Sequence, residues 1–89
     1  MAYRVTLKPS AVKELARLSK PIQERIATKI DALADNPRPH GCETLQGQDN
    51  LLRVRVGDYR IIYTVHDREL LVLVIRIGDR KEVYRRLSK

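Results

Sequence analysis

Four arginines and one tyrosine in the second half of the chain are the residues best suited to chemistry. A guanidinium offers a planar fork of donors that matches two phosphate oxygens. Several guanidiniums together can hold a phosphodiester and stabilise the extra charge of a pentacoordinate transition state. A tyrosine beside them can stack on a base or transfer a proton. These candidate catalytic residues are Arg53, Arg55, Arg60, Arg80 and Tyr84.

The chemistry that this set favours is RNA cleavage without a metal or other cofactor. The sequence has no acidic cluster with the spacing of metal ligands. RNA carries its own nucleophile, the 2′-hydroxyl, so its cleavage needs only alignment, charge stabilisation and proton transfer. His40 and His66 have no partner at metal or triad spacing, and we expect both on the surface. Cys42 has no flanking base, so it is predicted to be a passive loop thiol.

Four of the five candidate catalytic residues also have a purely structural interpretation. Arg53 and Arg55 on an exposed strand face are typical of solvated surface, and Tyr84 in a terminal segment is typical of a packing residue. Arg60 beside Tyr59 would serve equally well in a structural cation–π contact or ion pair. It is the occurrence of all of them together that favours a site.

Charge and composition narrow the class of partner. The net charge is +7, and residues 51–89 hold ten of the 18 basic but only five of the 11 acidic residues. A small basic domain favours nucleic acid or an acidic protein as its partner. A single cysteine fits a reducing compartment, and no apolar run is long enough for a membrane span. We therefore expect a cytoplasmic protein with no membrane partner.

The first half of the chain predicts a strand and two helices. Tyr3 to Leu7 alternates as a strand does, and Pro9 to Leu18 has an apolar residue every third position, beginning with Val12. Ser19-Lys20-Pro21 separates this helix from a longer one that Asn36-Pro37 ends. The apolar positions of the second helix lie on one face: Ile22, Ile26, Ile30 and Leu33.

The second half predicts three strands joined by tight turns, after a loop that Leu45 anchors on the core. The strands span Leu52–Val56, Tyr59–Val65 and Leu70–Ile77, and Gly57-Asp58 is a two-residue turn signal. The last strand is nearly all apolar, which indicates a central strand covered on both faces. The fold class is therefore α+β: residues 1–89 form a single domain with a small antiparallel sheet and an N-terminal helical hairpin on one face (β-α-α-β-β-β).

This arrangement positions the arginines. Arg53 and Arg55 are two residues apart on one strand, so they point the same way at roughly 6–7 Å. Arg60 lies on the next strand, just across the turn, where strand alternation places it on the opposite face of the sheet from Ile61. A two-residue turn would bring these three cations together, and Arg80 would emerge just past the last strand. The helices need one face of the sheet, so the arginines are expected on the other.

At this point the residues resemble a known family, the RelE-type toxins of the RelE/ParE superfamily. The resemblance covers essentially the whole chain. Its most specific parts are Leu52-Arg53-Val54-Arg55-Val56-Gly57-Asp58-Tyr59-Arg60 and Ile77-Gly78-Asp79-Arg80-Lys81-Glu82-Val83-Tyr84. Ala11-Val12-Lys13-Glu14-Leu15 and the Asn36-Pro37 helix exit also fit.

The resemblance implies a toxin of a type II toxin–antitoxin system that enters the ribosomal A site and cuts the messenger codon there. It implies attack by the 2′-hydroxyl without metal. Arg60 would stabilise the transition state, Arg80 the leaving group, and Tyr84 would stack or transfer a proton. Arg53, Arg55 and Lys81 would bind RNA. Well-studied members carry lysines at positions 53 and 55, and arginine, unlike lysine, cannot lose its proton in a protein.

The same resemblance implies partners and leaves two alternatives open. The partners would be the ribosome with its mRNA and a cognate acidic antitoxin of the RelB kind, with operator DNA reached only through the antitoxin complex. ParE-type toxins share the fold but inhibit DNA gyrase, and they usually lack an arrangement like Arg80 with Tyr84. The other alternative is a non-catalytic member that only binds its antitoxin in a repressor complex.

Overall fold

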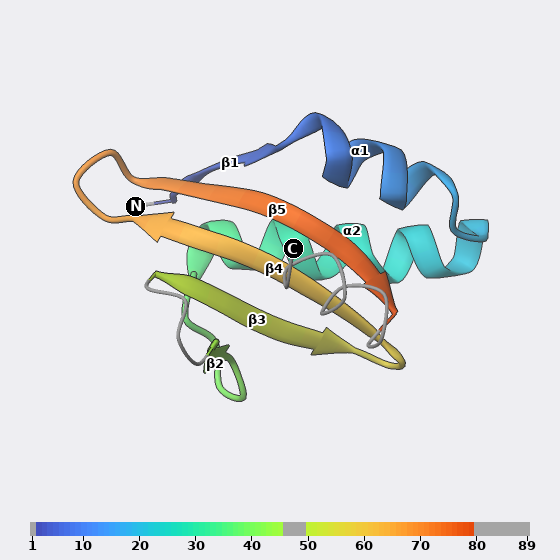
Figure 1. Ribbon diagram of the computed structural model, residues 1–89. Coiled ribbons are helices and arrows are strands. Elements are labelled where there is room, and N and C mark those ends of the chain that lie inside the picture. Colours follow the sequence, from blue (N-terminus) through green and yellow to red (C-terminus); the bar gives the residue numbers. More distant parts are fainter. Residues whose placement is uncertain (1, 46–49, 80–89) are drawn as a thin grey trace.

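One strand, two helices and four further strands follow one another in the described part of the chain (Figure 1). The computed structural model describes residues 2–45 and 50–79. The elements are β1 (Arg4–Leu7), α1 (Pro9–Ala16), α2 (Lys20–Asp35), β2 (Glu43–Thr44), β3 (Leu51–Val56), β4 (Tyr59–His66) and β5 (Leu71–Asp79). The α+β class is confirmed, and β2 is a short strand that the sequence did not predict.

The five strands form one mixed sheet in the order β1-β5-β4-β3-β2. Strands β3 to β5 pair antiparallel, as expected, and the short β2 pairs antiparallel with β3. Strand β1 instead pairs parallel to β5, with Arg4 opposite Leu71 and Leu7 opposite Val74. Parallel neighbours need a long crossover. Here the crossover is the whole segment between β1 and β5, so no local turn signal in the sequence predicts this pairing.

The place of β5 differs in part from the prediction. β4 is the central strand, and β5 lies beside it, between β4 and β1. Val72, Val74 and Ile77 of β5 are buried, whereas Leu71, Leu73 and Ile75 are only half-buried. The apolar run therefore marks an internal strand with one fully buried face, not a centre covered equally on both.

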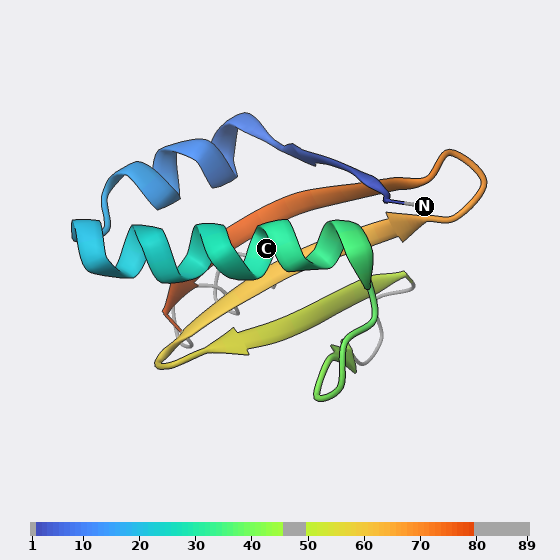
Figure 2. The ribbon, with the colours of Figure 1, turned by 180° about the vertical axis from the view of Figure 1, so that it is seen from behind.

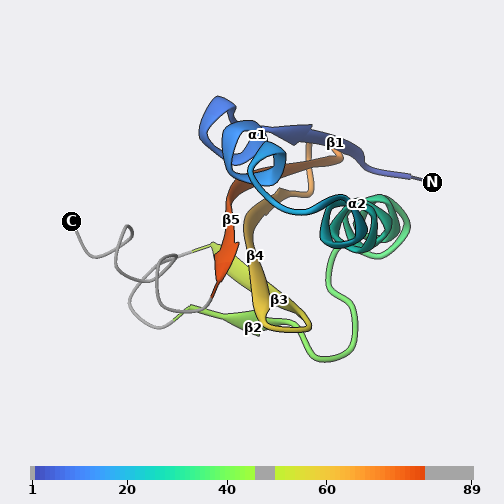
Figure 3. The same cartoon turned by 90° about the vertical axis from the view of Figure 1, so that its right-hand side faces the viewer.

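The core lies between the sheet and the helices. Figure 2 shows α2 running across the sheet, and Figure 3 shows α1 over the end where β1 and β5 lie. Burial of aliphatic side chains, at about 25 cal/mol per Å² of apolar surface, drives this packing. No helix within residues 2–45 and 50–79 is long and apolar enough to cross a membrane. The buried cluster comprises Ala11, Ile26, Ile30, Leu33, Val54, Ile61, Tyr63, Val72, Val74 and Ile77.

Helix α1 turns inward a face that agrees in part with the prediction: Leu15 and Leu18 pack against the core as expected, but Val12 does not. Val12 is 51% exposed, whereas Ala11 is fully buried and Glu14 is only 8% exposed. The reason lies in β5, whose register shifts by one residue opposite Ile62/Tyr63, just beyond the end of its pairing with β1. Beyond that point a side chain of α1, in place of the backbone of β1, bonds to β5: a Glu14 carboxylate oxygen accepts a hydrogen bond from the Ile77 N–H at 2.9 Å.

Ser10 completes this helix-to-strand connection. Its hydroxyl donates to the Ile75 carbonyl at 3.2 Å, and Arg76 lies 3.8 Å from the second carboxylate oxygen of Glu14. A buried carboxylate is costly unless it is paired and hydrogen-bonded. The backbone N–H and the guanidinium meet that requirement, which explains why an acidic residue occupies the inner face of α1.

The loop after α2 is anchored by Tyr63, and the prediction that Leu45 anchors it on the core is wrong. The Tyr63 hydroxyl donates to the carbonyl of buried Pro37 at 2.7 Å. Burial, with a smaller contribution from Cys42, raises the pKa of the Tyr63 phenol above its usual range, so it stays protonated as a donor. Leu45 is half-buried and lies outside the core cluster. This anchor fixes the start of the segment that leads to β2.

A second connection joins three distant segments at the surface. Asp67, in the β4–β5 turn, accepts two hydrogen bonds from Arg38 at 3.1 and 2.9 Å and one from the Tyr3 hydroxyl at 2.7 Å. These bonds lower the pKa of the Asp67 carboxyl to about 2, with Arg38 the larger cause. We refer to Tyr3, Arg38 and Asp67 as the surface clasp.

Candidate active site

The β3–β4 hairpin positions the candidate residues. Val56 pairs with Tyr59, so Gly57 and Asp58 form the predicted two-residue turn. Gly57 has φ +60°, which suits a tight hairpin turn with glycine at its first central position. A Cβ there would also lie 3.3 Å from the guanidinium of exposed Arg25, which would have to shift slightly. The turn therefore fixes the register between the two strands.

That register brings three arginines onto one face. Arg55 pairs directly with Arg60, and Arg53 pairs with Ile62, two positions further along the hairpin. Val54 and Ile61, with the alternate parity, are in the core. The prediction that Arg53, Arg55 and Arg60 cluster on the face opposite the helices is confirmed.

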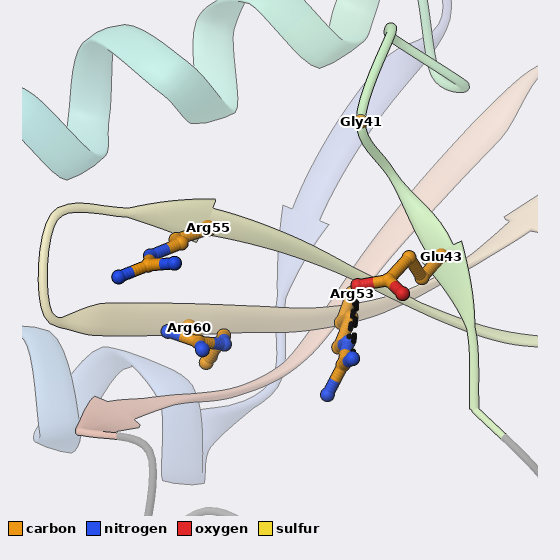
Figure 4. Close-up of a pocket in the computed structure, with 5 residues that line it drawn as sticks. All are labelled: Gly41, Glu43, Arg53, Arg55 and Arg60. Atoms are coloured by element: carbon orange, nitrogen blue, oxygen red, sulfur yellow. Dashed lines mark hydrogen bonds and ion pairs between the residues drawn. The ribbon is translucent and has the colours of Figure 1, made fainter.

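These arginines line a pocket of about 390 Å³ (Figure 4). In that view Arg55 and Arg60 project from neighbouring strands, and Arg53 lies further along β3 beside β2. Among the residues that the structure describes, Gly41 and Glu43 also line it. We call this cavity the arginine pocket.

The three arginines differ in burial and in their hydrogen bonds. Arg60 is only 7% exposed, and it donates a long bond of 3.5 Å to the Tyr59 carbonyl. Arg55 is exposed, and its Nε donates to the Gly57 carbonyl at 3.0 Å. Arg53 is half-buried and binds Glu43. Arg60 is therefore the most buried arginine of the pocket, and Arg55 is the most exposed.

Glu43 is the site residue that the sequence did not reveal. Strand β2 sets Glu43 opposite Arg53, whose Nε and Nη2 both donate to Oε1 of Glu43, at 3.1 and 2.8 Å. A strand of two residues has no periodicity to detect. The only available signal was an acidic residue following a Pro/Gly turn, just ahead of the arginine-bearing strand.

The charge of the arginine pocket determines what it can bind. Three guanidiniums face one carboxylate, so the pocket carries excess positive charge. Electrostatic attraction is stronger at a nearly buried group such as Arg60 than in bulk water. The pocket thus suits an anion with several oxygens, such as a phosphodiester. Among the described residues, no group of three or more His, Cys, Asp or Glu side chains is arranged to hold a metal ion.

The remaining predicted residues have separate outcomes. Arg80, Lys81 and Tyr84 lie outside the described residues. His40 and His66 are exposed, which confirms their predicted place on the surface. The His66 ring and the Thr64 hydroxyl share a hydrogen bond of 2.9 Å, on the surface and apart from the arginine pocket.

Comparisons with known proteins identify the family of this chain. The family model for the ParE toxin of type II toxin–antitoxin systems, parDE, matches residues 5–84. The chain is also 31% identical over 88 residues to the mRNA interferase toxin RelE of Escherichia coli, covering 94% of this chain and 92% of that protein.

Solved structures show the same fold. A free double mutant of the Escherichia coli toxin RelE superposes with a TM-score of 0.80 at 28% identity, covering 94% of this chain and 92% of that one. The archaeal RelE–RelB complex from Pyrococcus horikoshii gives a TM-score of 0.79 at 32% identity, covering 90% and 97%.

Fold, hairpin site and relatives thus lead to one assignment. The match to the family model and the full-length similarity to RelE both extend over the strands that carry the arginine pocket. The chain therefore belongs to the toxins of type II toxin–antitoxin systems that the ParE model describes, and within the RelE/ParE superfamily it is a RelE-type toxin.

Proposed function

We propose that this toxin is a metal-independent endoribonuclease of the cytoplasm that enters the ribosomal A site and cuts the mRNA codon there. The observation that carries the proposal is the convergence of Arg53, Arg55 and Arg60 in one pocket. The relative named as an mRNA interferase supports the choice of RNA over other anions.

The three arginines are assigned different roles according to how buried each side chain is. Arg60 is nearly buried, so its charge is available to stabilise the pentacoordinate transition state in a medium of reduced dielectric. Arg53 and Arg55 hold the flanking phosphates through their donor forks. Outside the described residues, we assign Arg80 to the leaving group, Lys81 to RNA binding, and Tyr84 to base stacking or proton transfer.

A cognate antitoxin is part of the proposal. The neighbouring structure from Pyrococcus horikoshii is a RelE–RelB complex, which supports a RelB-like partner here. A chain with net charge +7 favours an acidic antitoxin. Contact with operator DNA would run through the complex, not through the toxin alone.

A gyrase inhibitor is the second candidate. The match of residues 5–84 to the ParE family model favours it, because ParE-type toxins share the fold. The two functions predict different products, since one cuts RNA and the other stops DNA supercoiling.

The deciding experiment adds the purified toxin to programmed ribosomes and maps the ends of the message. We expect a cut at the A-site codon, with a 2′,3′-cyclic or 3′-phosphate and a 5′-hydroxyl. The cut should persist when EDTA lowers free divalent ions, with ribosome integrity checked by sedimentation. No cut in the message, together with loss of gyrase supercoiling in a parallel assay, would replace this function with the second candidate.

A further inference from the structure

The arginine pocket needs a group that accepts the proton of the attacking 2′-hydroxyl. Arginine cannot serve, because its guanidinium stays protonated in proteins. Of the five described residues that line the pocket, three are arginines, and a fourth, Gly41, has no side chain. Glu43 is therefore the one described lining residue whose side chain can take up a proton.

The geometry of Glu43 suits that task. Both hydrogen bonds from Arg53 go to Oε1, at 3.1 and 2.8 Å, so the ion pair orients the carboxylate through one oxygen. The second oxygen, Oε2, keeps its capacity to accept a proton. The side chain is 62% exposed at the side of the pocket, where a substrate can reach it (Figure 4). A base held by an orienting partner beside charge-stabilising donors is the arrangement that general-base catalysis requires.

We propose that Glu43 is the general base of the cleavage reaction, and this inference rests on the proposed function. Oε2 of Glu43 takes the proton of the 2′-hydroxyl while the 2′ oxygen forms a bond to phosphorus. The bond from phosphorus to the 5′ oxygen breaks, and that oxygen takes a proton from solvent. The products are a 2′,3′-cyclic phosphate and a 5′-hydroxyl. Arg53 is a positioning residue for the base as well as a phosphate contact.

A carboxylate among arginines has one other clear role, which makes the opposite prediction. Glu43 would then only occupy Arg53 and reduce the attraction for RNA until a phosphate displaces it. Removing its charge would strengthen binding and leave the cut as fast or faster. If Glu43 is the general base, removing its charge should instead slow the cut, because no other described lining residue can take up the proton in its place.

The test measures single-turnover cleavage of a message on programmed ribosomes, and ribosome binding separately, for the natural chain and three variants. Glu43→Gln keeps the shape but removes the base, Glu43→Asp keeps a carboxylate, and Glu69→Gln makes the same chemical change at an exposed carboxylate outside the pocket. We expect Glu43→Gln to slow the cut about 10²-fold or more without weakening binding. Glu43→Asp should recover part of that rate, and Glu69→Gln should match the natural chain.

A second message carries sulfur in place of the 5′-bridging oxygen at the scissile bond. Sulfur leaves without a proton, so it compensates for a missing acid but not for a missing base. Glu43→Gln should therefore remain as slow, relative to the natural chain, as on the ordinary message. A normal or faster cut by Glu43→Gln, or recovery on the sulfur message, would overturn the role of Glu43 while the proposed function stands. Absence of cutting by the natural chain would overturn the proposed function and the base together.

Discussion

At the scale of single residues, Arg60 is the side chain on which the proposed chemistry depends most. It lies on the predicted face of the sheet, lines the arginine pocket and is only 7% exposed. Arg60→Ala should slow cleavage about 10²–10³-fold, because a transition-state contact of this kind contributes about 2–4 kcal/mol. Single-turnover rates on programmed ribosomes measure the loss.

Burial of Arg60 calls for a control that an exposed residue would not need. Arg60→Lys keeps a positive charge and most of the volume but loses the planar donor fork. We expect it to unfold near the temperature of the natural chain and still cut slowly. If both variants unfold early, or if Arg60→Lys cuts at the natural rate, the geometry of the guanidinium is not what matters.

Arg55 is expected to act through binding. It lines the arginine pocket, is exposed and pairs with Arg60 in the register. Arg55→Gln should weaken binding to message-loaded ribosomes and lower the slope of log affinity against log salt by about one. Arg68→Gln, an exposed arginine in the β4–β5 turn, should change neither as much. Equal effects at the two positions would mean that only net charge counts.

The sequence predicted much of the site because strand alternation is a strong constraint. A one-residue slip would move every side chain of a strand to the other face, so Arg53 and Arg55 had to point together. The turn at Gly57 then placed Arg60 beside them. Glu43 escaped prediction, because its position depends on β2, which exists only through pairing with β3.

At the scale of elements, the connection between α1 and β5 is the feature most open to test. Glu14 is nearly buried and accepts the Ile77 N–H, so Glu14→Ala leaves a backbone donor unsatisfied. The expected cost is about 1–3 kcal/mol in the free energy of unfolding, measured in urea. Glu14→Gln, which keeps an acceptor oxygen, should cost less, and Lys13→Ala on the exposed side should cost little. Equal losses for the two Glu14 variants would mean that the accepted hydrogen bond is not the source.

The elements show where reasoning from local patterns stops. Apolar spacing predicted both helices, but it chose Val12 for the buried face and missed Glu14. A carboxylate is buried here because it replaces a neighbouring strand at the bulged end of β5, and that need arises only in the folded sheet. Local patterns did not predict the parallel pairing of β1 either, because it joins residues far apart in the chain.

At the scale of the whole molecule, the surface clasp should make stability depend on acid pH. The pKa of Asp67 is lowered to about 2 in the folded chain, so its stabilising effect is present above the unfolded value of about 3.9. That effect is lost as pH falls from about 4 towards 2. Asp67→Asn should therefore be less stable than the natural chain at pH 6, and the difference should shrink over that range in thermal unfolding.

Asp31→Asn, at an exposed aspartate of α2, provides the matched control. It should show a smaller difference from the natural chain across the same pH range. A constant gap between Asp67→Asn and the natural chain down to pH 2 would count against the clasp as the source of the acid sensitivity.

The pairing of β1 with β5 has a consequence for how the toxin is made. Strand β1 leaves the synthesising ribosome first, yet its partner begins only at Leu71. Domains fold as units, and a sheet that joins distant segments cannot close until both are present. The nascent chain therefore remains without its complete sheet until β5, which spans Leu71–Asp79, has been translated. A toxin proposed to attack ribosomes thus cannot reach its complete fold before the residues of β5 are available to pair with β1.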